Sequence, residues 1–217
     1  MQPMEPPAPP APPAPAAAPT TPAHGRVAPA LGRAALYYAQ RLGWPVFPLH
    51  SMRRDGDGAL VCTCGRPDCG SPAKHPRVAH GVKDATTDAD QIEAWWSEWP
   101  DAGIGIATGA TSAVVIDIDP SRGGEEAFAE LVRAAGGELP ETVVSNTGGG
   151  GCHLLFAPPT DGPRVTNSAN RIATGVDVRA DGGYIVAPPS LHASGRTYAW
   201  ETRPVRPGDE AAAGGQA

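Results

Sequence analysis

The sequence of 217 residues has no long uninterrupted run of apolar side chains. A helix that crosses a membrane needs about 20 consecutive apolar residues, so we expect no transmembrane segment. The first residues also lack the basic start and the continuous apolar region of a secretory signal peptide. We therefore expect a cytoplasmic protein that has no membrane among its partners.

Positive charge is also scarce, because 17 lysines and arginines stand against 23 aspartates and glutamates, for a net charge of −6. This balance argues against a protein that binds nucleic acid through its whole surface. A local exception lies between His50 and Lys83, where a basic loop could contact phosphate or could simply be solvated. Its basic residues are Arg53, Arg54, Arg66, Lys74, Arg77 and Lys83, against Asp55, Asp57 and Asp68.

Large apolar side chains are rare at both ends of the chain. Eleven of the 26 prolines fall between Pro3 and Pro29, in a tract made mostly of proline and alanine. Such a composition cannot bury enough apolar surface to fold, and it predicts a disordered extension over residues 1–28. The end of the chain predicts a second disordered segment over 204–217. One folded domain remains, over residues 29–203, and it is long enough for a hydrophobic core.

The folded part mixes helical and strand-like patterns. Helices are predicted over 28–43, 88–99 and 125–135. In the third helix, the residues expected to face inward are Phe128, Leu131, Val132 and Ala135. Short strands are predicted over 103–109, 113–120, 142–156, 175–179 and 184–190, and two prolines restrict residues 44–50 to a short or edge strand. The pattern predicts an α+β fold.

Three of the four cysteines gather with a histidine inside the basic loop at 53–83, within fourteen positions rich in glycine, proline and aspartate that leave no room for a helix or a core. The four side chains are Cys62, Cys64, Cys69 and His75, which form a complete tetrahedral zinc set. Disulfides or free thiols are the alternatives. Zinc is favoured because no export signal is present, because cysteines two positions apart bridge poorly, and because Cys152 is distant in sequence.

Two aspartates follow one another in the strand predicted over 113–120. Alternate side chains of a strand point to opposite faces, so Asp117 and Asp119 share one face and could bind one cation. The opposite face would be the buried one and would carry Val114, Ile116 and Ile118. A solvated pair of carboxylates is the alternative.

Two later segments add further candidates. Residues 142–156 predict two strands joined by a loop whose backbone amides could wrap phosphate oxygens, followed by His153. The loop residues are Gly148, Gly149, Gly150 and Gly151. A plain hairpin with a core histidine is the alternative. The strand at 175–179 places Asp177 and Arg179 on one face, which strengthens the interpretation as a metal site.

Taken in order, these motifs resemble the bifunctional DNA primase/polymerase N-terminal domain, the prim-pol branch of the archaeo-eukaryotic primase superfamily. The resemblance runs from Ala34 to Trp200. It rests on IDID at 116–119, SNTGGGGCH at 145–153 and GVDVRADGGYIVAPPS at 175–190, preceded by the segment at 35–49 and KHP at 74–76. It implies an RRM-like antiparallel-sheet core with flanking helices, in which the zinc loop is an insertion.

By this resemblance, Asp117 and Asp119 match the first metal-binding motif of the family, and Asp177 matches its third carboxylate. His153 matches a histidine that contacts the incoming nucleotide, and Arg179 is a candidate contact of the triphosphate. The resemblance implies template-dependent nucleotidyl transfer, in primer synthesis, DNA extension or both, by a mechanism with two Mg²⁺ or Mn²⁺ ions. Single-stranded DNA and nucleoside triphosphates would be the partners, and the zinc loop would hold the template or the 5′ end of the primer.

Two other functions stay open on the residues alone. A metal-dependent phosphohydrolase or nuclease could use the same carboxylates with water as the nucleophile. A non-catalytic module could bind nucleic acid or nucleotide without reacting. The sequence contains no GxxxxGK[ST] motif of an ATPase, so a cooperating helicase would be a separate protein.

Overall fold

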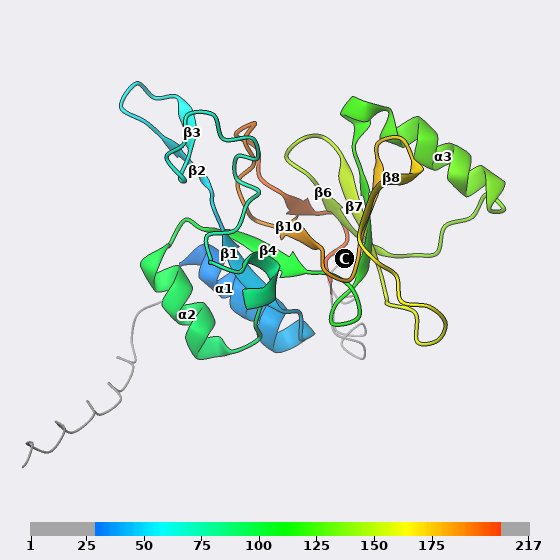
Figure 1. The fold of residues 1–217 in the computed structure, drawn as a ribbon, viewed down its shortest axis with the longest axis horizontal. Coiled ribbons are helices and arrows are strands. Elements are labelled where there is room, and N and C mark those ends of the chain that lie inside the picture. The colour runs from blue at the N-terminus through cyan, green and yellow to red at the C-terminus, as the bar shows by residue number, and fades with distance from the viewer. Residues whose placement is uncertain (1–28, 205–217) are drawn as a thin grey trace, which may run out of the picture.

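The computed structural model describes residues 29–204 and has a mixed α+β architecture with antiparallel sheets (Figure 1). A three-stranded sheet with helices α1 (Ala30–Leu36) and α2 (Ala89–Glu98) forms one half. A six-stranded sheet with helix α3 (Gly124–Ala134) forms the other half. The α+β class predicted from the sequence is confirmed.

The three-stranded sheet has β4 (Gly103–Ala107) at its centre, between β1 (Val46–Leu49) and β10 (Tyr184–Ala187). Both pairings are antiparallel. As predicted from its prolines, β1 is a short edge strand. Gly105 of β4 lies under the ring of Phe47, where an added Cβ would stand 2.6 Å from the ring atom Cζ. A glycine is therefore needed where the two strands pair.

The two helices of this half lie in the predicted segments. After α1, the chain continues as a π-helix over Tyr37–Arg41. The side chain of Asp88 caps α2 by accepting a hydrogen bond from the backbone N–H of Gln91 at 2.9 Å. Trp96 of α2 is 1% exposed, and its indole N–H donates to the carbonyl of Ala102 at 3.0 Å. This tryptophan therefore packs in the hydrophobic core.

The six-stranded sheet is antiparallel throughout. Its strands are β5 (Val114–Ile118), β6 (Val143–Asn146), β7 (Cys152–Phe156), β8 (Ser168–Ala173), β9 (Val176–Arg179) and β11 (Ala199–Trp200). Their order in space is β11-β6-β7-β5-β9-β8. Helix α3 contacts β5, β8 and β9 and so covers one face. Ala135, predicted to face inward, is exposed instead, because α3 ends at Ala134.

The two sheets share one hydrophobic core, which contains Val115, Leu155, Ile104, Ile106 and Ile185. This arrangement corrects part of the expected buried face of β5, on which Ile118 is buried as predicted. Val115 alternates with Asp117 along the strand and is 0% exposed, whereas Val114 and Ile116 are only half-buried. The face of β5 that carries Asp117 also carries Val115, which the three-stranded sheet covers. This face is therefore buried at Val115 and more open at Asp117.

The segment at 53–83 is more ordered than predicted. It holds a hairpin made by β2 (Met52–Arg54) and β3 (Leu60–Cys62), and a 3₁₀ helix over Gly81–Asp84. A small core cluster joins Met52 and Cys62 to Ala73. The expected absence of a core around the cysteines is therefore wrong, because the hairpin brings Met52 and Cys62 opposite each other in register, whereas residues 62–75 contain no helix, as predicted.

The disordered segment predicted over 1–28 lies outside the described residues, as does the tail predicted over 204–217 except for its first residue. Pro204, the first residue of the predicted tail, is described and buried. Between residues 29 and 204, no helix has the length and apolar character needed to cross a membrane.

Candidate functional site

Four polar residues form a row across the six-stranded sheet. Asp117 of β5 lies directly opposite His153 of β7 on one side and Asp177 of β9 on the other, and His153 lies opposite Ser145 of β6. Residues directly opposite in an antiparallel sheet project from the same face, with Cβ atoms about 4.5–5.5 Å apart. The row therefore brings two predicted carboxylates and the predicted histidine together.

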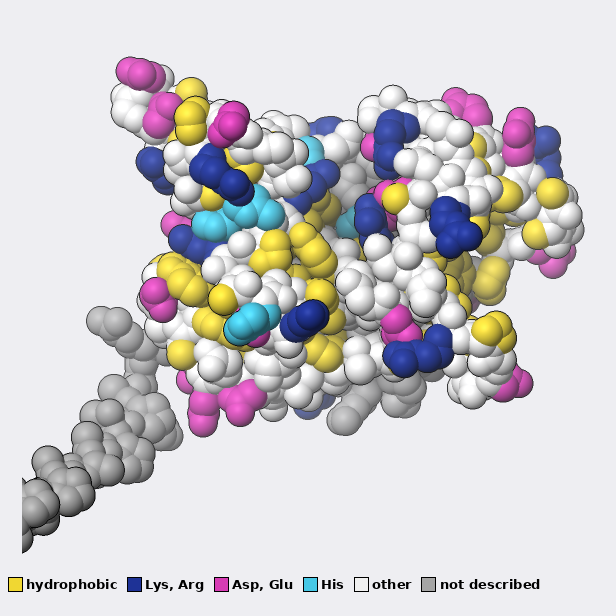
Figure 2. All heavy atoms as spheres, viewed as in Figure 1, with side chains coloured by type: hydrophobic (Ala, Val, Ile, Leu, Met, Phe, Trp, Pro, Cys, Tyr) yellow, Lys and Arg dark blue, Asp and Glu magenta, His cyan; other side chains and the backbone are white. Residues whose placement is uncertain are grey.

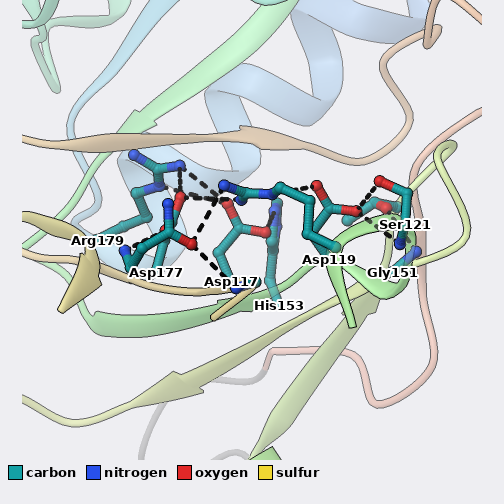
Figure 3. A network of polar contacts seen from close by, with 11 residues as sticks. Asp117, Asp119, Ser121, Gly151, His153, Asp177 and Arg179 are labelled. Carbon is teal, nitrogen blue, oxygen red and sulfur yellow. Dashed lines mark hydrogen bonds and ion pairs between the residues drawn. The ribbon is translucent and has the colours of Figure 1, made fainter. Parts of the chain in front are cut away.

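Arg179 joins two of these carboxylates (Figure 3). Its Nη2 atom donates to Oδ2 of Asp177 at 2.7 Å and to Oδ2 of Asp117 at 3.2 Å, and its Nε lies 3.3 Å from the same Asp117 oxygen. Asp177 is 4% exposed and also accepts a hydrogen bond from the backbone N–H of Asn170 at 2.9 Å. A buried carboxylate with these partners is held in one orientation.

Asp119 follows the end of β5 and is held differently. Its Oδ1 atom accepts hydrogen bonds from the N–H and the hydroxyl of Ser121, and its Oδ2 pairs with Nε of Arg122 at 2.9 Å. The hydrogen bond from the Ser121 side chain and the pairing with Arg122 lower the pKa of Asp119 below its ordinary value. The same guanidinium reaches Asp177 at 3.5 Å. Arg122 therefore links Asp119 to Asp177.

Sequence reasoning missed Arg122 and Asn170. The available signal for Arg122 was its position three residues after Asp119, in the turn that Pro120 begins. Asn170 has a positive φ of 52°, and its amide oxygen accepts hydrogen bonds from Arg122 and from the backbone of Gly175. No spacing in the sequence connects residue 170 with this site.

His153 is buried beside the carboxylates. Its Nε2 lies 3.6 Å from Oδ1 of Asp117, and burial lowers the pKa of its imidazole below the ordinary value. Within residues 29–204, its Nδ1 atom and the hydroxyl of Ser145 are buried without a hydrogen-bond partner. Burying two polar atoms without hydrogen bonds lowers the stability of the folded protein, unless another group bonds to them.

The glycine loop has mixed roles. An added Cβ at Gly151 would stand 2.1 Å from the carbonyl oxygen of Ile118, and one at Gly148 would stand 2.2 Å from Cβ of His192. The backbone N–H groups of Gly150 and Gly151 donate to Thr147 within the turn. Close packing therefore explains two of the four glycines, and two of the four amides are engaged inside the hairpin.

Several of these residues line a cavity of about 490 Å³ between the two halves of the molecule, whereas Asp177, Gly148 and Gly150 do not. Figure 2 shows a hollow there, with acidic, basic and histidine side chains on its walls. Of the predicted site residues, the lining includes Asp117, Asp119, His153, Arg179, Gly149 and Gly151. Residues that sequence reasoning did not assign to this cavity also line it, among them Lys74, Arg122, Tyr184 and Tyr198.

The second candidate site is the cysteine cluster. Ligand atoms of Cys62, Cys64, Cys69 and His75 all lie within 4.8 Å of one another. The sulfur atoms of Cys62 and Cys69 each lie 3.5 Å from Nε2 of His75. All four cysteines of the chain are free, so the disulfide alternative is wrong. Among residues 29–204, this is the one group of three or more such side chains gathered closely enough to hold a metal ion.

The electrostatics favour the thiolate form at one ligand of the cluster, Cys64, whereas desolvation and the neighbouring Cys64 and Cys62 raise the pKa of Cys69. A hydrogen bond from the backbone of Arg66 lowers the pKa of Cys64 to about 6, and thiolates are the form in which cysteine binds zinc. His50 lies beside the cluster, with its ring centroid 4.4 Å from that of His75. Burial and the neighbouring His75 lower the pKa of His50 to about 4. The four residues can bind zinc.

One comparison with known proteins identifies a family for most of this chain. The family model for the bifunctional DNA primase/polymerase N-terminal domain matches residues 35–213. The match includes both the aspartate site and the cysteine cluster. No curated protein matches the chain.

Proposed function

Since the chain belongs to the bifunctional DNA primase/polymerase N-terminal family, we propose that it is a nucleotidyltransferase that copies single-stranded DNA. The observation that carries this proposal is that Asp117, Asp119, Arg179 and His153 line one cavity, with the buried Asp177 held by Arg179. The reaction joins the α-phosphate of a nucleoside triphosphate to the 3′-hydroxyl of a strand paired with the template. It requires positioning and charge neutralisation more than covalent chemistry.

The three aspartates are the proposed ligands for divalent metal ions, although their carboxylates are paired with Arg179 and Arg122 and are not gathered as closely as the ligand atoms of the cysteine cluster. The Oδ2 atoms of Asp117 and Asp177 already approach one positive charge, because both lie within 3.2 Å of Nη2 of Arg179. Carboxylate oxygens are the ligands that Mg²⁺ and Mn²⁺ prefer. Asp117, Asp119 and Asp177 would hold the ions, which when bound lower the pKa of the attacking hydroxyl and neutralise charge on the triphosphate.

Arg179 and Arg122 orient the carboxylates and supply positive charge at the cavity wall. Since each guanidinium offers five N–H donors, each can keep a carboxylate partner and still bind a phosphate oxygen. His153 is held neutral by burial, so it would supply a hydrogen bond rather than a charge to the nucleotide. Gly149 and Gly151 border the same space and let the triphosphate approach the backbone closely.

The cysteine cluster is proposed to bind one structural Zn²⁺ with Cys62, Cys64, Cys69 and His75. Four protein ligands leave no open position for a reacting water, so the ion would hold the shape of the basic segment at 53–83. This segment would contact the template or the 5′ end of the primer.

The deciding experiment incubates the protein with single-stranded DNA, Mn²⁺ and labelled nucleotides, with and without a primer. We expect chain extension together with release of pyrophosphate. Nucleotide or DNA hydrolysis without extension would instead identify a phosphohydrolase or nuclease, and binding without either product would identify a non-catalytic module.

The matched variant is Asp117→Ala combined with Asp119→Ala. We expect it to lose nucleotide incorporation while its circular dichroism stays that of the wild type, because the other elements of the sheet are unchanged. Asp161→Asn, in an exposed loop outside the cavity lining, is the control and should retain full activity. Incorporation at the wild-type rate by the double variant would contradict the assignment of the site.

A further inference from the structure

Lys74 belongs to both candidate sites. It immediately precedes His75, a member of the cysteine cluster, and it lines the cavity that holds Asp117 and His153. Its side chain is exposed, and its positive charge is near enough to contribute, after burial, to the lowered pKa values of His153 and His192. One residue thus places the cysteine cluster next to the aspartate site.

The backbone around Lys74 is fixed from several directions. The hydroxyl of Tyr184 donates to the carbonyl of Lys74 at 2.8 Å, and the backbone N–H of His50 donates to the carbonyl of His75 at 2.8 Å. Ala73 is 1% exposed and has a positive φ of 60°, an uncommon conformation for a residue with a side chain. The backbone of residues 73–75 is therefore held in one conformation beside the cavity. The cysteine cluster lies at the His75 end of this segment.

The charge of Lys74 is available for a ligand. Arg122 and Arg179, the other basic residues of the cavity wall, are paired with aspartates at 2.7–3.5 Å. In the described part of the chain, the ammonium group of Lys74 makes no hydrogen bond and no ion pair. An ammonium group is a compact point charge that suits phosphate. Among the lysine and the two arginines of this cavity wall, Lys74 is thus the residue whose charge is not paired with a carboxylate.

We propose that Lys74 binds the triphosphate of the incoming nucleotide and that the metal-bound cysteine cluster holds Lys74 in position for this contact. The choice of substrate rests on the proposed function. The cysteine cluster then acts on the catalytic cavity itself, in addition to any contact with the template. The nucleotide triphosphate is favoured over the DNA backbone because Lys74 shares its cavity with the aspartates and with Gly149 and Gly151.

A footprinting experiment tests this without turnover. The chain contains two lysines, Lys74 and Lys83, and Lys83 is exposed and outside the cavity lining. The zinc-loaded protein is acetylated with an activated ester, and modification of each lysine is measured by mass spectrometry. We expect inorganic triphosphate and dATP with Mg²⁺ to slow acetylation of Lys74 severalfold and to leave Lys83 unchanged.

Other outcomes overturn the proposal. Equal protection of both lysines would mean non-specific shielding by the anion. Protection of Lys74 by a single-stranded oligonucleotide but not by triphosphate would assign the residue to the DNA backbone. Absence of any protection would remove Lys74 from the site.

The role of the cluster is tested by repeating the footprint on Cys69→Ser and on Tyr184→Phe. Cys69→Ser should abolish triphosphate protection of Lys74, and Tyr184→Phe should weaken it because the hydrogen bond to the Lys74 carbonyl is lost. If Cys69→Ser does not fold, Tyr184→Phe alone decides. Wild-type protection in the folded variants would refute the positioning role.

Kinetics separate this proposal from the proposed function. If the protein extends primers, Lys74→Ala should raise the KM for nucleotide about tenfold with a smaller change in kcat, and Lys83→Ala should change neither. Lys74→Arg should restore part of the loss. If the wild type protects Lys74 but never extends a primer, the proposed reaction fails while the triphosphate site stands.

Discussion

At the scale of single residues, three aspartates share a site because two arginines lie between them. Asp117 and Asp177 are direct neighbours across the sheet, and like charges directly opposite are destabilising. Arg179 and Arg122 offset this repulsion by bonding to all three carboxylates. The alternation of a strand predicts that Asp117 and Asp119 share a face, but it does not predict Arg122, whose contact with Asp177 spans 55 positions.

His153 gives a pH-dependent stability that can be measured. Burial lowers its pKa in the folded protein, whereas in the unfolded chain its pKa is about 6.5. The unfolded state therefore binds more protons as the pH falls below about 6.5, so this stabilisation is complete above that pH and is lost on acidification. The contribution of one such histidine is up to about 1.4 kcal/mol per pH unit.

We therefore expect the free energy of unfolding to fall between pH 6.5 and pH 5, and to fall less steeply in His153→Gln. Urea denaturation at several pH values, in buffers that contain zinc, measures both slopes. Other histidines, such as His50 and His192, contribute equally to the wild type and to His153→Gln. The difference between the two pH slopes therefore measures the contribution of His153. Identical slopes would contradict a buried neutral His153.

At the scale of elements, the hairpin formed by β2 and β3 explains the cysteine cluster. Sequence spacing predicted that the four side chains form one group, and they do lie together. It did not predict the hairpin, which places Cys62 at the end of β3 and opposite Met52. Such a short strand pair has little alternation to reveal it, and only the paired arrangement buries Cys62.

Metal analysis tests this element. We expect about one zinc ion per chain, because the four ligands are complete and free of disulfides. Cys64→Ser should lower the zinc content and the thermal midpoint. Cys152→Ser, which changes the cysteine on β7 outside the cluster, should leave the zinc content unchanged. A metal-free protein with the wild-type fold and stability would rule out structural zinc.

At the scale of the whole molecule, the two sheets are joined by a common core that sequence patterns could not show. Alternation predicts which residues share a face of one strand, but not which other strand lies beside it. The strand at 103–107 pairs with 184–187, about 80 positions later, and Val115 is buried by that sheet rather than left beside Asp117 in solvent. The predicted helices and strands were found, whereas their pairing depends on long-range contacts.

This shared core predicts cooperative unfolding. Val115→Ala should lower the free energy of unfolding by about 2 kcal/mol, because Val115 is 0% exposed between the sheets. Ile172→Ala, at a side chain that is 45% exposed on β8, should change it little. Differential scanning calorimetry should show one transition in each protein. Two separated transitions in Val115→Ala would mean that the halves fold independently.

The in-register row of Ser145, His153, Asp117 and Asp177 also decides where the chain tolerates insertions and deletions. Removing a single residue from β5, β7 or β9 would turn the following side chains to the other face and disperse the row without changing the fold class. The mostly exposed stretch at 157–163, between β7 and β8, lies outside this row and outside the cavity lining, so its length can vary. Length variation among functional relatives should therefore gather in such connections, and the spacing within the three strands should stay constant.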